Sequence, residues 1–200
     1  MAGTNSTAKS RLFIAIQIPE PVRNEILRVQ QELRQLASPD AIRWTKPEQF
    51  HLTLKFLGGI PEDSVPALKE SVQAVCAAGQ PLRLDARGAG FFPDARSPRV
   101  IWIAVSDDEG KLAVLQKAIE TVTRRFAEKP GAEKFAGHAT LGRFKNPKQQ
   151  DIEMIASHLN AMETRLFGTW TAREVKIVCS ELSPSGARHF PLAAFCLGGC

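Results

Sequence analysis

The chain has 200 residues, of which 44% are hydrophobic and 24% charged. This is the composition of an ordinary globular protein, long enough for one well-buried domain or for two lobes that share a cleft. The formal net charge of +5 fits a polyanionic ligand, although a solvated basic surface gives the same charge. No stretch approaches the roughly 20 apolar residues that a membrane span needs, so we expect a cytoplasmic protein without a membrane partner.

The opening segment and the cysteines indicate whether the chain carries a signal peptide or a zinc site. Residues 1–10 are small and polar and lack the apolar core of a signal peptide, so we expect a disordered tail before a single bilobal domain over 11–200. No cysteine pair has C-x-x-C spacing, which argues against a zinc site and favours free thiols that are buried or terminal. The four cysteines are Cys76, Cys179, Cys196 and Cys200.

Apolar periodicity predicts helices that alternate with strands. In chain order, the expected elements are a strand over 12–18, a helix over 19–36, strands over 42–44 and 50–57, a helix over 61–78, strands over 82–92 and 99–105, a helix over 109–126, a strand over 137–144, a helix over 151–162, and strands over 169–182 and 189–197. Gly88 and Gly90 predict a bend or bulge in the strand over 82–92. Most links contain hairpin-like turns, which favours an α+β fold with mainly antiparallel sheets flanked by helices.

Two short segments have the same pattern of histidine, apolar residue, threonine, apolar residue. They are His51-Leu52-Thr53-Leu54 and His138-Ala139-Thr140-Leu141. In a strand, alternate residues share a face, so each His and Thr should face one side while the apolar pair enters a core. The copies lie 138 − 51 = 87 residues apart, and a helix is expected soon after each. We therefore expect two similar lobes that each contribute one His-Thr strand to a shared groove.

Two histidines across a groove can act as a general acid and a general base, because imidazole titrates near pH 6.5. The hydroxyls of Thr53 and Thr140 can donate hydrogen bonds to anionic oxygens. An acid, a base and two oxyanion donors suit in-line attack at a phosphodiester, and no cofactor or metal is required.

Three further residues follow the motifs. Arg143 would lie on the strand face opposite His138, unless a bulge at Gly142 turns its guanidinium toward a bound phosphate. Phe56, at the corresponding place in the first copy, could stack on a base or pack in the core. Lys55 is expected to be solvated.

The sequence resembles the two-histidine phosphoesterases, in particular the bacterial and archaeal RNA 2′,3′-cyclic phosphodiesterases that are also called 2′-5′ RNA ligases. The resemblance runs from residue 11 to near the end of the chain. Besides the two HxTx motifs and Arg143, the matching segments are 12–16 with Pro19, 43–44, 55–58, 88–93, 98–102, 180–182 and 186–188.

The resemblance implies two lobes related by a pseudo-twofold axis, with the active groove between them. It also implies metal-free and ATP-independent opening of a terminal RNA 2′,3′-cyclic phosphate to a 2′-phosphate, with reversible 2′-5′ ligation as a further activity. His138 would activate water and His51 would protonate the 3′ oxygen, while Thr53, Thr140 and Arg143 would hold the phosphate. RNA ends, tRNA-like fragments among them, are the implied partners of an expected monomer.

The chain departs from the family pattern at His189, where relatives commonly have tyrosine. This residue either simply replaces one amphipathic ring by another or contacts the base or ribose of the RNA end. Three alternatives to an RNA phosphodiesterase stay open at this point. They are a sister phosphodiesterase acting on small cyclic nucleotides, a non-catalytic module that binds RNA ends, and a metallohydrolase, although both motif strands lack carboxylates.

Overall fold

The computed structural model describes residues 8–128, 134–183 and 186–199. Its elements, in chain order, are β1 (Lys9–Gln17), α1 (Glu20–Leu36), β2 (Ile42–Trp44), a 3-10 turn at Pro47–Gln49, β3 (His51–Pro61), a 3-10 turn at Glu62–Ser64, α2 (Val65–Ala78), β4 (Leu82–Phe92), β5 (Val100–Ser106), α3 (Lys111–Thr123), β6 (His138–Phe144), α4 (Gln149–Asn160), β7 (Leu166–Ala172), β8 (Glu174–Ser183) and β9 (Gly186–Cys196).

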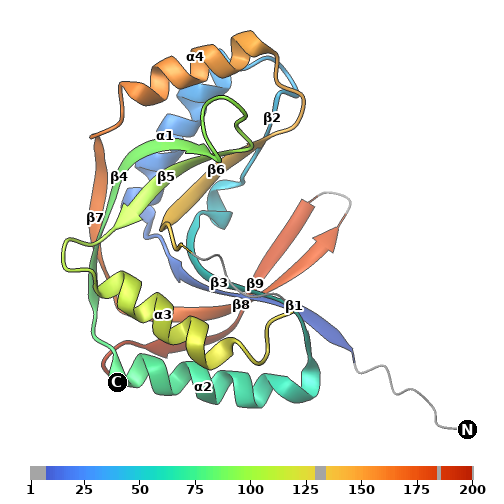
Figure 1. The fold of residues 1–200 in the computed structure, drawn as a ribbon, viewed down its shortest axis with the longest axis vertical. Coiled ribbons are helices and arrows are strands. Elements are labelled where there is room, and N and C mark those ends of the chain that lie inside the picture. Colours follow the sequence, from blue (N-terminus) through green and yellow to red (C-terminus); the bar gives the residue numbers. More distant parts are fainter. Residues whose placement is uncertain (1–7, 129–133, 184–185, 200) are drawn as a thin grey trace, which may run out of the picture.

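The strands form two sheets, which are antiparallel throughout. The first sheet has the order β3-β1-β8-β9, and the second has the order β2-β6-β5-β4-β7. Helices α2 and α3 pack together near the first sheet, whereas α1 and α4 lie against the second (Figure 1). The expected α+β architecture with two lobes is confirmed.

The two lobes repeat one arrangement of strands and helices. In the first, β1 pairs with the motif strand β3, and α2 follows β3 and packs near its sheet. In the second, β5 pairs with the motif strand β6, and α4 follows β6 and packs against that sheet. In both lobes, the helix that connects the paired strands packs against the sheet of the other lobe. Helix α1 connects β1 to the β2–β3 segment and contacts β7 of the second sheet, whereas α3 connects β5 to β6 and contacts β3 of the first sheet. This exchange ties the lobes together and holds β3 beside β6.

Each lobe has its own hydrophobic core. In α1, Val22, Ile26, Val29 and Leu33 recur at helical spacing and are buried against the second sheet. A carboxylate in the first turn of α4 stabilises the start of this helix. Asp151 accepts hydrogen bonds from the backbone N–H groups of Lys148 and Ser38 at 2.8 and 2.7 Å. The cores therefore fix the two motif strands from behind.

Most predicted elements are confirmed, although several boundaries differ. Lys9 and Ser10 lie in β1, while residues 1–7 of the expected tail are outside the described residues. Strand β3 continues through the two glycines to Pro61, because β1 pairs along its full length. The single strand expected over 169–182 is two strands, β7 and β8, which belong to different sheets. Two residues of the expected turn at 183–186, 184 and 185, are also outside the described residues.

The cysteines only partly follow the prediction. Cys76 and Cys179 are free thiols, as expected. Cys196 is disulfide-bonded, so the expectation of a free thiol there is wrong. Whether two sulfurs come within bonding distance depends on the local path of the chain, which cysteine spacing does not reveal. Cys200 lies outside the described residues. Within the described part of the chain, none of the helices is both long enough and apolar enough to cross a bilayer.

Candidate active site

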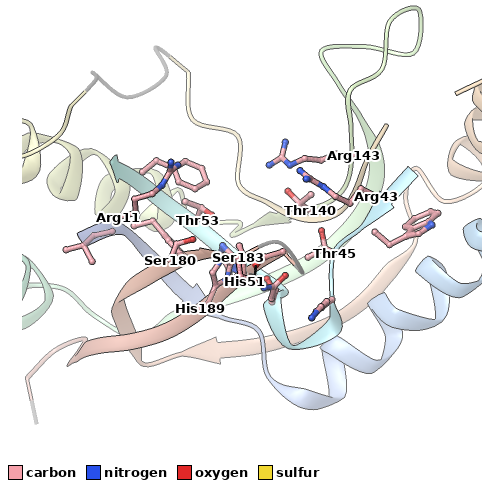
Figure 2. Close-up of a pocket in the computed structure, with 18 of the residues that line it drawn as sticks. Arg11, Arg43, Thr45, His51, Thr53, Thr140, Arg143, Ser180, Ser183 and His189 are labelled. Atoms are coloured by element: carbon pink, nitrogen blue, oxygen red, sulfur yellow. Dashed lines mark hydrogen bonds between the residues drawn. The ribbon is translucent and has the colours of Figure 1, made fainter. Parts of the chain in front are cut away.

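Both motifs face one cavity of about 770 Å³. His51 and Thr53 enter it from β3, and His138 and Thr140 enter it from β6. Figure 2 shows His51, Thr53 and Thr140 among the side chains that line the cavity. The intervening apolar residues point the other way, and all four are buried: Leu52, Leu54, Ala139 and Leu141. The predicted alternation of the two motifs is therefore present, and the fold brings both motifs to the same cavity.

The two imidazoles are held in the same way. Nδ1 of His51 lies 2.6 Å from the carbonyl oxygen of Gln49, and Nδ1 of His138 lies 2.7 Å from that of Ala136. A carbonyl can only accept a hydrogen bond, so Nδ1 must carry the proton in each neutral ring. Nε2 is then the nitrogen with a free lone pair on each histidine. Each carbonyl belongs to the residue two positions before its histidine, which repeats the quasi-symmetry of the motifs.

Aromatic rings cover one side of each imidazole. His51 stacks on Phe13 with 4.8 Å between centroids, and His138 meets the ring of Phe92 edge to face at 4.9 Å. Burial lowers the pKa of His51 to about 4, although its backbone hydrogen bond partly opposes this change. Burial also lowers the pKa of His138, with a smaller contribution from the nearby Arg143 cation. Both imidazoles are therefore neutral in the empty cavity at neutral pH.

A bulge at the fourth residue of each motif changes the faces of the residues that follow. In β3 the pairing with β1 skips Leu54, and in β6 the pairing with β5 skips Leu141. Each bulge shifts the alternation by one residue. As a result, Phe56 and Arg143 both line the same cavity as the histidines. The sequence predicted such a bulge for Arg143, whose side chain Figure 2 shows extending into the groove.

The same bulge explains why the expectation for Lys55 is wrong. Lys55 is only 3% exposed, and its Nζ lies 2.5 Å from Oε2 of Glu120 on α3. Unbroken alternation would have put Lys55 on the face opposite the buried Leu54, where it would be solvated. The bulge instead turns Lys55 inward, where it joins the motif strand to the helix that crosses over from the other lobe.

The cavity is strongly basic. Arg11, Arg43, Lys46 and Arg143 line it, and its described lining residues include no aspartate or glutamate. None of the ion pairs between described residues involves these four cations. Burial lowers the pKa of Arg143, and the neighbouring Arg43 lowers it further. Like charges held this close without a carboxylate between them favour an anionic ligand.

Two residues with open alternatives can now be placed. Phe56 is 67% exposed, so it does not pack in the core. It lies at the cavity near Phe13, with 6.0 Å between ring centroids. His189 also lines the cavity and contacts both Phe13 and His51. His158, which belongs to no motif, lies elsewhere and pairs with Glu32 at 3.0 Å.

Sequence reasoning did not single out Arg11 or Arg43 as site residues. Arg11 comes from β1 and Arg43 from the short strand β2, and Figure 2 shows them at opposite ends of the groove. Arg43 lies between Ile42 and Trp44, and Arg11 directly precedes the apolar part of β1, but many surface arginines have such a setting. Only the pairing of the strands shows which arginines reach the cavity. Among the described residues, no three His, Cys, Asp or Glu side chains come together in a way that could hold a metal ion.

Comparison with known proteins identifies the family of this chain. A family model described as LigT-like phosphoesterase matches residues 16–102, which include the first motif. The chain is 30% identical over 188 residues to an RNA 2′,3′-cyclic phosphodiesterase of Methanothermobacter thermautotrophicus, covering 94% of this chain and 98% of the relative. It is 33% identical over 195 residues to the Thermus thermophilus protein of the same name, covering 94% of this chain and 91% of the relative.

Solved structures have the same fold. The protein TT0787 of Thermus thermophilus superimposes with a TM-score of 0.78 at 28% identity, covering 94% of this chain and 98% of that one. Escherichia coli LigT, solved in complex with 3′-AMP, superimposes with a TM-score of 0.72 at 22% identity and with the same coverage of both chains. With whole-length relatives at 30% identity or more, this chain belongs to the LigT-like, two-histidine phosphoesterase family.

Proposed function

We propose that the protein is an RNA 2′,3′-cyclic phosphodiesterase that opens a terminal cyclic phosphate to a 2′-phosphate. The relatives with this name cover nearly the whole chain, which supports the reaction class. One observation supports the mechanism above the others. Two equivalently anchored imidazoles face one cavity, and each keeps Nε2 free for proton transfer.

In the proposed reaction, Nε2 of His138 removes a proton from a water molecule as the water oxygen attacks phosphorus. The bond between phosphorus and the 3′ oxygen breaks, and His51 gives its Nε2 proton to that oxygen. The products are a 3′ hydroxyl and a 2′-phosphate, and one proton has moved from water to His138 while another has moved from His51 to the sugar. General acid and base groups of this kind each contribute about 10²–10⁴-fold in rate.

Because the pKa of His51 is low, this histidine depends on the bound substrate to gain the proton that it donates. An imidazole that is neutral in the empty cavity cannot act as an acid until it gains a proton. The cyclic phosphate carries a negative charge, and a nearby anion raises the pKa of an imidazole. Binding of the substrate therefore prepares the acid, while the second histidine stays available as the base.

The remaining groups of the cavity hold the anion. Thr53 and Thr140 offer hydroxyl donors from equivalent positions, and Arg143 offers a guanidinium that can bind two phosphate oxygens. As charge develops on the phosphorane oxygens, the fixed hydroxyl donors stabilise the transition state more than the ground state, whereas the Arg143 guanidinium binds the phosphate in both states. Phe56 and His189 are placed to contact the terminal base or ribose, since both line the cavity beside Phe13.

The deciding experiment uses an oligoribonucleotide that ends in a 2′,3′-cyclic phosphate, with a metal chelator and without ATP. We expect complete conversion to the 2′-phosphate, identified by its phosphorus NMR shift against authentic 2′- and 3′-phosphates. A 3′-phosphate would reverse the leaving group and contradict the roles given to the two histidines. Conversion only of mononucleoside cyclic phosphates would favour the sister phosphodiesterase, and binding without conversion would favour the RNA-end module.

Ligation can be tested in the same assay. A 5′-hydroxyl RNA can replace water as the nucleophile, which would join the two ends through a 2′-5′ bond with the same 3′ leaving oxygen. We expect this product only at high concentrations of the 5′-hydroxyl strand, because water is always in excess.

A further inference from the structure

A second cavity, of about 710 Å³, adjoins the first. The two cavities share Arg43 and Arg143, and the second adds Lys145, while none of the histidines reaches it. Its lining contains three cations and one described carboxylate, Asp40. Among the described residues, no ion pair includes any of these four side chains.

The two shared arginines are held side by side by strand pairing. Arg43 on β2 is the direct cross-strand partner of Arg143 on β6, and Figure 2 shows both side chains extending in the same direction. Like charges directly opposite each other on a sheet are destabilising. Gly142 leaves room for the side chains of β2, since a Cβ at this position would lie only 2.8 Å from Cγ2 of Ile42. The sheet thus holds two guanidinium groups together at the boundary between the cavities.

An arrangement of this kind suits more than one phosphate. Arg143 reaches the cavity of the histidines, whereas Lys145 lies only in the second cavity. In an RNA with a 2′,3′-cyclic end, every other phosphate lies on the 5′ side of the terminal nucleoside, and the nearest is its 5′ phosphodiester. Grooves that hold single-stranded nucleic acid commonly follow this backbone with positive charge.

We propose that Arg43 and Lys145 form a second phosphate subsite, which holds the phosphodiester on the 5′ side of the terminal nucleotide. This proposal rests on the proposed function and adds to it the residues that bind the RNA chain beyond its terminal nucleotide. Arg43 connects the two phosphates, and Lys145 contacts only the upstream one.

The test measures binding separately from turnover. The probes are a nucleoside 2′-phosphate, the dinucleotide that ends in the same 2′-phosphate, and that dinucleotide with an uncharged methylphosphonate linkage. We expect the wild-type protein to bind the charged dinucleotide about tenfold more tightly than the other two, the size of one charge-assisted contact. For single strands, one additional phosphate contact also steepens the slope of log K against log salt by about 0.7.

Variants locate the contact. Lys145→Ala should reduce the preference for the charged dinucleotide to about twofold and remove its additional salt dependence. Asp40→Asn should change the preference in the opposite direction, because it removes the carboxylate of the second cavity; asparagine tolerates the positive φ of 63° found there. Lys117→Ala is the matched control, since Lys117 is exposed on α3 and lines neither cavity.

Equal affinity of the wild-type protein for all three probes would overturn the proposal, as would an unchanged preference in Lys145→Ala. The result is independent of the activity assay. If the cyclic phosphate is not opened but the charged dinucleotide binds as expected, the phosphodiesterase assignment fails and the second subsite stands. If the cyclic phosphate is opened but the probes bind equally, the second subsite is ruled out and the phosphodiesterase assignment stands.

Discussion

The imidazole rings of His51 and His189 meet edge to face, with their centroids 5.5 Å apart. Phe13 contacts both rings, at 4.8 Å from His51 and 5.0 Å from His189. Two cations this close would repel each other, so each ring disfavours a proton on the other. This contact adds to the effect of burial, the larger cause, in lowering the pKa of His51. His189 therefore acts directly on a proposed catalytic group.

The first prediction concerns the pH dependence of kcat/KM, which reports the free enzyme. The reaction needs one histidine protonated and the other neutral, so the profile should be bell-shaped. Its acid limb should lie near pH 4, the pKa of His51, and its alkaline limb below pH 6.5, because the pKa of His138 is also lowered. The optimum of kcat/KM should therefore lie below pH 6.5. The profile of kcat should be displaced to higher pH, since bound phosphate raises both pKa values. An alkaline limb of kcat/KM above pH 7.5 would contradict this prediction.

The second prediction concerns His189→Gln. Glutamine cannot become a cation, so the repulsion that lowers the pKa of His51 is removed. The acid limb of the kcat/KM profile should move to higher pH, while the alkaline limb should stay in place. The control is His158→Gln, because His158 lies outside the cavity and pairs with Glu32. If the acid limb is unchanged in His189→Gln, His189 does not influence the pKa of His51, and the prediction is wrong.

Much of the site could be predicted because both motifs repeat a local pattern. Strand periodicity alone places His51 and Thr53 on one face, and the same holds for His138 and Thr140. The bulges are harder to predict, because they depend on how each motif strand pairs with a neighbour distant in sequence. This is why the burial of Lys55 was not foreseen, although the reorientation of Arg143 was suggested by the adjacent glycine.

The parts that sequence could not supply depend on tertiary contacts. The break between β7 and β8 moves the chain from one sheet to the other, yet no glycine or proline marks it and only the exposed pair Arg173 and Glu174 interrupts the alternation. Arg43 belongs to a segment that resembles the family, but no local pattern gives it a role, and its register with Arg143 is what brings it to the cavity. Local patterns therefore predicted the positions of the candidate catalytic side chains better than those of the residues that surround them.

The third prediction concerns the two proposed proton-transfer groups. His51→Ala and His138→Ala should each reduce kcat by at least about 100-fold, because each removes one general acid or base. Both histidines lie at the start of a strand and are only half-buried, so circular dichroism should show an unchanged fold. His158→Ala again serves as the control. If either variant kept more than about a tenth of the wild-type rate, the two-histidine mechanism would be wrong.

The fourth prediction concerns Arg143→Ala. Loss of a charge-assisted contact to the reacting phosphate should lower kcat/KM by about 10- to 100-fold, mainly through KM. Arg143→Lys should recover part of the loss, since it restores the charge without the two-pronged geometry. Arg96→Ala, in an exposed turn outside the cavity, should have no effect. A fall in kcat at constant KM would instead give Arg143 a role confined to the transition state.

The fifth prediction concerns stability rather than catalysis. Lys55→Met removes the buried ammonium that pairs with the Glu120 carboxylate at 2.5 Å. Breaking a buried pair in this way costs about 3 kcal/mol, whereas replacing both charges by apolar groups can cost far less. We therefore expect denaturant unfolding to show a loss of about 3 kcal/mol in Lys55→Met and recovery of most of it in Lys55→Met with Glu120→Leu.

The matched control for this pair is Lys111→Met, which removes one member of the exposed Lys111–Glu109 pair. Such an exposed pair contributes little to stability, because water and salt screen it, so the free energy of unfolding should hardly change. Equal and small effects of Lys55→Met and Lys111→Met would mean that the ammonium inside the first lobe does not stabilise it. The expected difference would instead show that the bulge in β3, by turning Lys55 inward, links the motif strand to the helix that crosses between the lobes.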